Sequence, residues 1–277
     1  MKLKLHSKIY TYCILIVISV FLAFPLFWLF LTSFKTEVQL FEFPIKILPH
    51  PFTLKNYAEV ISDGSMFGYM KNSLIIAIAT TVCTLIISIP GAYALAKIKF
   101  RFSKALLATI LVIRMLPSVT GILAMYQILT KLKLIDTRIG LIIYYLPGSV
   151  VFMVILLRNF FVDFPQEMEE AGKIDGLSTL GIIRYILIPI TLPAIASASL
   201  MCFLSSWNEF IGAATILRSP DLMTMPVGIQ AQAQNTFQIY WGSLTSNTVI
   251  YVLPVIAFTI FTNKGLISGL TAGAVKE

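Results

Sequence analysis

The chain has 277 residues, of which 57% are hydrophobic and only 12% charged, and its mean hydropathy is +0.86. This composition excludes an ordinary soluble domain and indicates an integral membrane protein. The formal net charge of +8 does not indicate a nucleic-acid-binding protein, because the lysines and arginines are scattered between apolar runs, where such charges orient helices. The three cysteines lie in separate apolar runs, which predicts free thiols at Cys13, Cys83 and Cys202.

The N-terminal part of the chain predicts a first membrane-spanning helix. Lys2, Lys4 and Lys8 precede an apolar run without charges, 9–34. This run is longer than the core of a signal peptide and lacks a clear cleavage site, so we expect an uncleaved transmembrane helix with its N-terminus in the cytoplasm. The mixed-charge loop 35–71 then lies outside.

The second and third apolar runs return the chain to the cytoplasm and cross again. Run 72–96 ends beside a basic cluster, which fixes this end as cytoplasmic and consists of Lys97, Lys99, Arg101 and Lys104. Pro90 and Gly91 predict a kink or an early end of this helix. Run 105–130 predicts a single third span. It carries Arg114, and inserting a charged side chain into the centre of a membrane costs about 2.5 to 3.5 kcal/mol. Two placements that avoid this cost stay open: the side chain snorkels toward the cytoplasm past the proline at position 117, or it faces the interior of the bundle.

Three further runs complete a prediction of six spans. The fourth is 139–157, the fifth is about 185–210 with Pro189 and Pro193 early in it, and the sixth is 242–262. The segment 220–241 is an outer loop rich in glutamine and glycine. An even number of spans places both termini in the cytoplasm.

A polar segment at about 163–185, between the fourth and fifth spans, predicts two short helices joined by a tight turn. Pro165 fits a first helical turn, and the glutamates that follow it favour the positive end of the helix dipole. Asp175 and Gly176 form a turn, in which Gly176 is the expected left-handed stop, and Ser178 can cap the next helix.

One side of the first short helix predicts a contact with a partner. Met168, Ala171, Gly172 and Asp175 are spaced by three or four residues and share this side. Because Ala171 and Gly172 are small, a partner's backbone could approach closely. The alternative is an amphipathic linker that lies on the membrane surface.

This segment resembles the EAA loop of ABC-importer permeases. The family pattern is Glu-Ala-Ala, three residues, Gly, nine residues and Ile-x-Leu-Pro; the matching residues are Glu170, Ala171, Gly172, Gly176, Ile186, Ile188 and Pro189. Gly172 replaces the second alanine and Ile188 replaces the leucine. In that family the loop is the cytoplasmic coupling helix, held in a cleft of the ATP-binding subunit. The resemblance implies that the coupling residues are Glu169, Glu170, Ala171, Gly172, Asp175, Gly176 and Pro189.

Three other stretches resemble the carbohydrate-importer permeases of the maltose type. They are WNEF at 207–210, TMPVGI at 224–229 and GLISGLTAGAVK at 265–276. The resemblance implies an all-α integral membrane protein with six transmembrane helices and the type I ABC importer permease fold. A first helix and outer loop, 1–71, would precede a five-helix core, 72–277.

The same resemblance implies partners and contact residues. The partners are a second homologous permease subunit, two ATP-binding subunits and an extracytoplasmic solute-binding protein, assembled in the lipid of the cytoplasmic membrane. The outer loop would contact the binding protein through Gln230, Gln234, Asn235 and Phe237, and the tail would contact the ATP-binding subunits through Thr271, Ala272 and Gly273. A solvated connector and a disordered terminus are the alternatives. The candidates for the transport pathway or the subunit interface are Arg114, Asn208 and Glu209.

The chain carries no motif for catalysis. It has no P-loop, so ATP hydrolysis is expected on partner subunits, and its two histidines, His6 and His50, predict neither a metal site nor another cofactor site. The aromatic candidates for sugar contact are Tyr144, Tyr145, Trp207 and Tyr240, although aromatic residues at span ends more often form the interfacial belt.

The expected function is therefore that of a permease subunit in an ATP-driven importer of a carbohydrate. Closure of the ATPase subunits would move the coupling helix and swing the fourth and fifth spans about their prolines. Two alternatives stay open: an ABC permease for a non-sugar solute, such as a polyamine or a phosphate ester, and a membrane scaffold without transport activity. The residues do not predict which sugar is carried.

Overall fold

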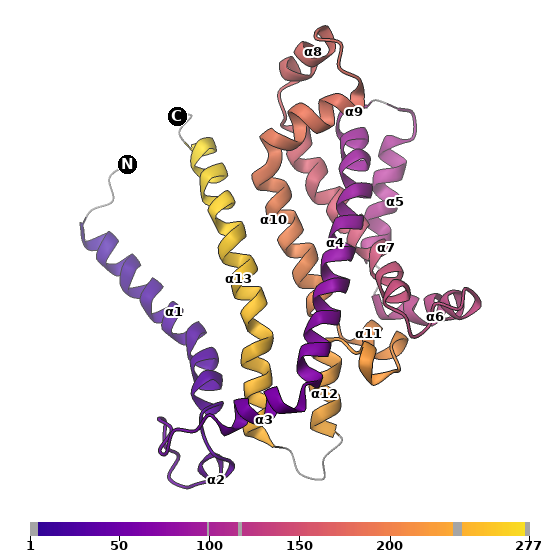
Figure 1. The fold of residues 1–277 in the computed structure, drawn as a ribbon. Helices are drawn as coiled ribbons and strands as arrows, with labels where there is room; N and C mark the ends of the chain where they lie inside the picture. The colour runs from indigo at the N-terminus through magenta and orange to yellow at the C-terminus, as the bar shows by residue number, and fades with distance from the viewer. Residues whose placement is uncertain (1–4, 99, 116–117, 235–239, 275–277) are drawn as a thin grey trace. The chain divides into compact units, whose positions relative to one another are not determined.

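A computed structural model describes residues 5–98, 100–115, 118–234 and 240–274, and every regular element in these ranges is a helix (Figure 1). The α-helices are α1 (Leu5–Thr32), α2 (Glu37–Leu40), α3 (Lys55–Asp63), α4 (Ser65–Lys97), α5 (Ser103–Met115), α6 (Ile122–Lys131), α7 (Arg138–Val162), α8 (Gln166–Ile174), α9 (Thr179–Ile182), α10 (Ile188–Trp207), α11 (Ile211–Ile216), α12 (Met225–Gln234) and α13 (Trp241–Ala274). Two 3₁₀ turns, η1 (Ser118–Gly121) and η3 (Pro220–Leu222), and a π-helical turn, η2 (Ile183–Leu187), complete the set.

Five described helical segments are long and apolar enough to cross a membrane. They are Tyr10–Thr32, Ser65–Lys97, Arg138–Val162, Thr179–Trp207 and Trp241–Ile260. They coincide with the first, second, fourth, fifth and sixth spans of the sequence analysis. The all-helical membrane class is thereby confirmed.

The predicted third span is not one continuous helix. In the described part of 105–130, α5 ends at Met115 and α6 starts at Ile122 after the turn η1. The 13 residues of α5 extend about 20 Å at 1.5 Å per residue, which is less than the hydrocarbon core of about 30 Å. A proline at position 117 and Gly121, both poor helix residues, lie between the two helices in the sequence.

At two other places the structure decides between the outcomes that the sequence allows, or adds detail to them. The helix α4 does not end early at Pro90 but continues through it to Lys97. The outer loop predicted at 220–241 contains the turn η3 and the ten-residue helix α12.

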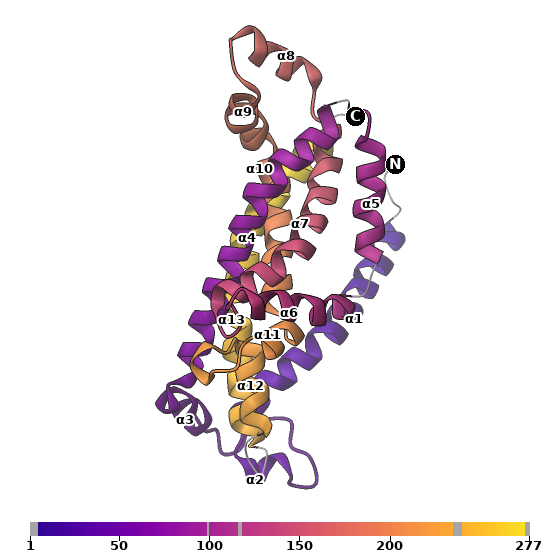
Figure 2. The same cartoon turned by 90° about the vertical axis from the view of Figure 1, so that its right-hand side faces the viewer.

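The chain forms two compact units, one of which consists of residues 68–228 and 254–277. In the part 68–228, α4, α5, α7 and α10 run alongside one another, and α8 and α9 lie at one end (Figures 1 and 2). Near that end, an apolar cluster joins α4, α7 and α10; its members include Tyr93, Leu157, Phe161, Phe164 and Ile195. A second cluster, around Leu129, Leu141, Tyr145 and Ile216, joins α6, α7 and α11 at the other end.

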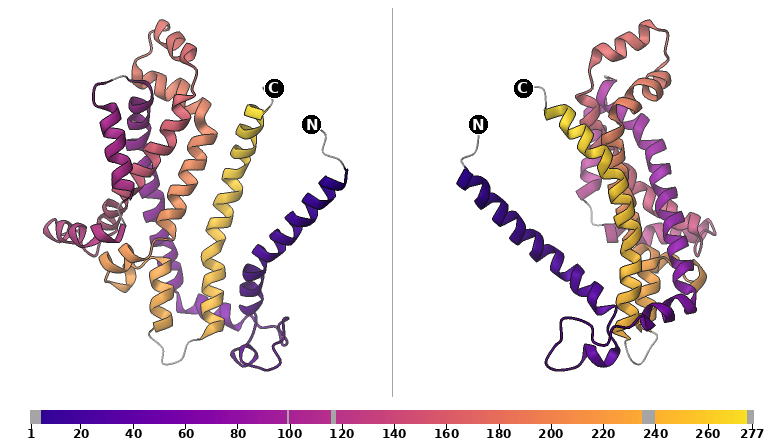
Figure 3. Two further views of the ribbon diagram at one scale, coloured as in Figure 1. Left: turned by 180° about the vertical axis from the view of Figure 1, so that it is seen from behind. Right: turned by 60° about the vertical axis from the view of Figure 1, so that its left-hand side comes forward.

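The other unit consists of residues 1–67 and 229–253. Its segments meet at Ser33, whose carbonyl accepts hydrogen bonds from Asn56 Nδ2 (2.9 Å) and Ser246 Oγ (3.3 Å). The helix α1 leaves this meeting point with exposed side chains over 10–27, as a helix surrounded by lipid would (Figure 3). The division of the chain at residue 71 stays a prediction.

Candidate functional site

The segment between α7 and α10 has the two short helices and the turn that the sequence predicts. Helix α8 follows Pro165, and Gly176 adopts a φ of +82° directly after its C-cap residue Asp175. The amide of Leu177 donates back to the carbonyl of Gly172 (2.9 Å), which closes the helix end. Ser178 Oγ accepts from the amide of Gly181 (3.3 Å) and caps α9. Local turn and cap chemistry therefore shapes this segment.

The predicted coupling residues on α8 divide into exposed and buried ones. Glu170, Ala171 and Asp175 are exposed, whereas Gly172 is buried. A Cβ atom on Gly172 would lie 2.6 Å from Ile186 Cδ1, so Gly172 allows α8 to pack on η2 of the same chain. It is not open to a partner's backbone, contrary to the expectation from helical spacing.

Glu169 is the other buried residue of α8, and it faces the end of α4. Its carboxylate lies 3.5 Å from Lys97 Nζ and accepts from the hydroxyl of Tyr93 at 3.4 Å. Lys97 Nζ also donates to the carbonyl of Phe164 (2.6 Å). Sequence reasoning missed this arrangement, because it assigned Lys97 only to the basic cluster. Residues 72 or more positions apart give no spacing signal.

The last predicted coupling residue, Pro189, is the second residue of α10, which directly follows the π-turn η2. Proline lacks an N–H group, and its ring crowds the carbonyl four residues earlier, here that of Tyr185. A wider π-turn at this point accommodates both effects. The helical path from Thr179 to Trp207 is thus continuous but distorted next to the coupling segment.

Glu209, in the WNEF stretch, connects three elements at the other end of α10. Its carboxylate oxygens accept from the amides of Gly212 (2.7 Å) and Ala213 (3.1 Å) at the start of α11 and from the hydroxyl of Tyr145 on α7 (2.7 Å). Three short hydrogen bonds use both of its oxygens. Asn208 beside it is exposed and donates to the carbonyl of Leu204 (2.9 Å).

A cavity of about 1000 Å³ lies beside this connection, lined mainly by α7 and α10. Its polar lining includes Tyr144, Tyr145, Ser205, Ser206 and Glu209. The hydroxyl of Ser206 is buried and has no hydrogen-bond partner among the described residues. Trp207 is buried against Phe203 (5.6 Å between ring centroids) and does not line the cavity. Of the four aromatic candidates for sugar contact, Tyr144 and Tyr145 therefore come together here.

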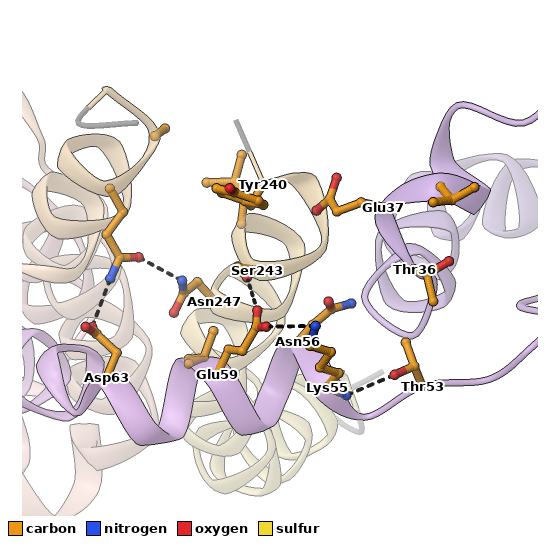
Figure 4. Close-up of a pocket in the computed structure, with 15 residues that line it drawn as sticks. Thr36, Glu37, Thr53, Lys55, Asn56, Glu59, Asp63, Tyr240, Ser243 and Asn247 are labelled. Atoms are coloured by element: carbon orange, nitrogen blue, oxygen red, sulfur yellow. Dashed lines mark hydrogen bonds and ion pairs between the residues drawn. The ribbon is translucent and has the colours of Figure 1, made fainter. Parts of the chain in front are cut away.

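A second cavity, of about 750 Å³, lies in the unit formed by 1–67 and 229–253 (Figure 4). Its carboxylates hold α12 and the start of α13: Glu37 accepts from the amide of Gly242 (2.7 Å), Glu59 from Ser243 Oγ (3.3 Å) and Asp63 from Gln232 Nε2 (3.5 Å). Tyr240, the remaining aromatic candidate, lines this cavity. These acidic residues lie apart in an ordinary mixed-charge loop, so their positions in the sequence give no sign that they line one cavity.

Several candidate residues have no described side chain. Gln230 is an exposed residue of α12, whereas Asn235 and Phe237 lie outside the described residues. The backbones of Arg114, Gln234, Thr271, Ala272 and Gly273 belong to α5, α12 and α13, and their side chains lie outside the described set. Their predicted contacts stay predictions.

Comparison with known families identifies the chain. Residues 85–264 match the family described as "binding-protein-dependent transport system inner membrane component". The chain belongs to this family. As a permease subunit it is a membrane component of an ABC transporter and not itself an enzyme, since ATP hydrolysis takes place on separate subunits.

Relatives and solved structures agree with this membership. The permease is 32% identical over 253 residues to a sulfoquinovosyl glycerol transport system permease of Agrobacterium fabrum, covering 91% of this chain and 88% of the relative. It is 30% identical over 263 residues to a trehalose/maltose transport system permease of Thermococcus litoralis, covering 94% of each. Its fold matches a chain of a bacterial ABC transporter that imports alginate, with a TM-score of 0.81, 21% identity and coverage of 95% of this chain and 99% of that one.

Proposed function

We propose that this permease is the transmembrane subunit of an ATP-driven, binding-protein-dependent importer of a carbohydrate. The observation that carries the proposal is the full-length similarity to permeases whose named solutes are glycosides. Besides the two relatives above, a diacetylchitobiose uptake permease of Streptomyces coelicolor is 25% identical over 276 residues, with full coverage of both chains. A shared solute class over the whole chain length favours a sugar over a polyamine or a phosphate ester.

The proposed assembly contains a second homologous permease subunit, two ATP-binding subunits and an extracytoplasmic binding protein. We place both termini in the cytoplasm, with α5 and the interrupted segment after it as the third of six crossings. The end of α4 and the start of α5 lie at the same end of the bundle as α8 (Figure 2), and the sequence at this junction is rich in basic residues. By the positive-inside rule this end faces the cytoplasm, where the ATP-binding subunits are.

In the proposed mechanism, the exposed residues of α8 contact an ATP-binding subunit. Glu170, Ala171 and Asp175 form this contact, whereas buried Gly172 lets α8 pack on η2 and exposed Gly176 makes the turn after α8. Closure of the ATPase subunits then moves α8 as a rigid body and swings α7 and α10, the latter about the distorted helix before Pro189. The tail residues Thr271, Ala272 and Gly273 add a second contact with these subunits.

The solute is proposed to pass the cavity beside Glu209. Hydroxyls, a carboxylate and two tyrosine rings are the groups that recognise a sugar, since they combine hydrogen bonding with flat apolar faces. Asn208 and Arg114 are the further candidates for this pathway or for the interface with the second permease. On the extracytoplasmic side, Gln230 and the residues after it would contact the binding protein.

A purification in mild detergent tests the proposal. The tagged permease should co-purify with an ATPase and a second permease, and the binding protein loaded with its sugar should stimulate ATP hydrolysis. In this complex, Glu170→Lys should abolish uptake but leave membrane insertion intact. Stimulation by a polyamine-binding protein would indicate another solute. Unchanged uptake after deletion of the chain would indicate a scaffold.

A further inference from the structure

The helix α8 is attached to the rest of its unit in two chemically different ways. On one side, buried Gly172 brings its backbone against Ile182 and Ile186, which belong to the helical path that leads into α10. On the other side, buried Glu169 reaches Tyr93 and Lys97, which belong to α4. A movement of α8 can therefore reach α10 through apolar packing and α4 through a buried charge.

The contact between α8 and α4 is electrostatic and is shielded from water. The side chains of Glu169 and Lys97 are only 6% and 15% exposed. A charge pair that is removed from water interacts more strongly than one at the surface, because solvent and salt screen it less. Lys97 is also held by the carbonyl of Phe164, at the end of α7, so that the pair lies where three segments meet.

The distances within the pair leave it room to adjust. The two contacts of the Glu169 carboxylate, at 3.4 and 3.5 Å, are long for charge-assisted hydrogen bonds. Its Oε1 atom is buried, within ion-pair distance of Lys97 Nζ but without a hydrogen bond among the described residues. Because this oxygen accepts no hydrogen bond, the carboxylate can move relative to Tyr93 and Lys97 and still attract the lysine.

From this geometry we propose that Glu169, Lys97 and Tyr93 form a joint that transmits the movement of α8 to α4. Lys97 and Tyr93 act as positioning residues: they hold the buried carboxylate and do not contact the ATP-binding subunit themselves. The inference rests on the proposed function, because it needs an ATPase that moves α8. It adds a second route of coupling, into α4, to the one that leads into α10.

The test measures how strongly the binding protein stimulates ATP hydrolysis in the reconstituted complex, since that signal must cross the permease. In Glu169→Gln and Lys97→Met we expect basal hydrolysis within about twofold of wild type and a stimulation reduced by about 3- to 30-fold, the range for residues that carry coupling between sites. The double variant Lys97→Glu with Glu169→Lys should recover part of the stimulation. The matched control is Glu167→Gln, an exposed glutamate of the same helix.

A purely structural role would give a different result, in which assembled complex, basal hydrolysis and stimulated hydrolysis fall in proportion. If the complex with Glu169→Gln does not assemble, Tyr93→Phe distinguishes the coupling role from the structural one. It removes only one long hydrogen bond and should still lower the stimulation of ATP hydrolysis. Full stimulation of ATP hydrolysis in all variants would overturn the proposed joint but leave the proposed function standing. A wild-type complex that the binding protein does not stimulate would overturn the proposed function and the joint together.

Discussion

Two tyrosine–glutamate pairs lie at opposite ends of the helices α7 and α10, and they differ in how tightly the carboxylate is held. Glu209 accepts three hydrogen bonds of 2.7 to 3.1 Å through both oxygens. Glu169 has contacts of 3.4 and 3.5 Å, and one of its oxygens accepts no hydrogen bond among the described residues. The same two residue types therefore make a rigid anchor at one end and an adjustable contact at the other.

The difference follows from what each glutamate is bonded to. Glu209 binds the free amides at the start of α11, whose positions are fixed by the helix itself. Glu169 binds the ends of two long side chains, which can follow it when it moves. The end near Glu209 is expected to contribute to stability, whereas the end near Glu169 is expected to contribute to coupling.

The largest effect is expected when each of the two glutamates is replaced by glutamine, which tests the contrast between the rigid anchor and the adjustable contact. In Glu209→Gln, an amide group replaces a carboxylate oxygen that accepts a hydrogen bond, so that two donors face each other and the variant loses about 2 to 3 kcal/mol of stability. In Glu169→Gln, the amide N–H can donate to the hydroxyl of Tyr93, which can also accept, while the amide oxygen faces Lys97, so that no two donors face each other and we expect a loss of less than about 1.5 kcal/mol. Thermal unfolding of the purified permease in one detergent measures both.

Tyr145→Phe is the control for the anchor. It removes one of the three hydrogen bonds to Glu209 and should cost about 1 kcal/mol. Equal losses of stability in Glu209→Gln and Glu169→Gln would contradict the contrast between anchor and joint.

A second prediction concerns the packing at the anchor. Gly212 lies under the ring of Tyr144, and a Cβ atom there would come within 2.1 Å of Tyr144 Cε1. A rigid ring cannot move its edge away without displacing the cavity wall, so Gly212→Ala should cost about 1 to 3 kcal/mol. The same unfolding measurement applies. Restored stability in the double variant with Tyr144→Ala would identify the ring contact as the cause.

The sequence predicts the features that depend on neighbouring residues. Long apolar runs are sufficient to place five spans, because a helix in lipid needs about 20 apolar residues. The stop at Gly176 and the cap at Ser178 follow from local backbone chemistry. The family resemblance adds the identity of the segment that contains them.

Features that depend on packing between distant residues could not be predicted. Hydropathy gives no sign that the apolar run 105–130 is divided between α5 and α6, although a proline at position 117 and Gly121 mark the division in the sequence. The pairs of Glu169 with Lys97 and of Glu209 with Tyr145 each join different helices, and no periodicity connects them. Helical spacing places Gly172 beside Met168 but does not decide which neighbour covers it.

A third, smaller effect involves Asp136, which fastens the loop before α7 to the loop after α11. Hydrogen bonds from the hydroxyl and amide of Ser219 and from the amide of Arg218 lower the pKa of Asp136 below its ordinary value of 3.8. Because the pKa of Asp136 is lower in the folded than in the unfolded protein, its hydrogen bonds stabilise the fold fully at pH values above its pKa in the unfolded state. This stabilisation is lost as the pH falls through its pKa in the folded state. Between about pH 5 and pH 3, wild type should therefore lose more stability than Asp136→Asn. Parallel pH profiles would contradict this fastening role.

The smallest effect is expected for Gly172→Ala, on the adjustable side of the comparison. The added methyl group would meet Ile186 Cδ1 at 2.6 Å, but this atom is the end of a flexible side chain that can rotate away. Alanine also favours a helix over glycine by about 1 kcal/mol, which offsets the crowding. We therefore expect a change in stability of less than about 1 kcal/mol and nearly normal stimulation of ATP hydrolysis, whereas Gly172→Trp should separate α8 from η2 and abolish the stimulation. A severe loss of stability or of stimulation in Gly172→Ala would mean that the packing of α8 is as rigid as the hydrogen bonding of Glu209. The two ends of the bundle would then not differ as proposed.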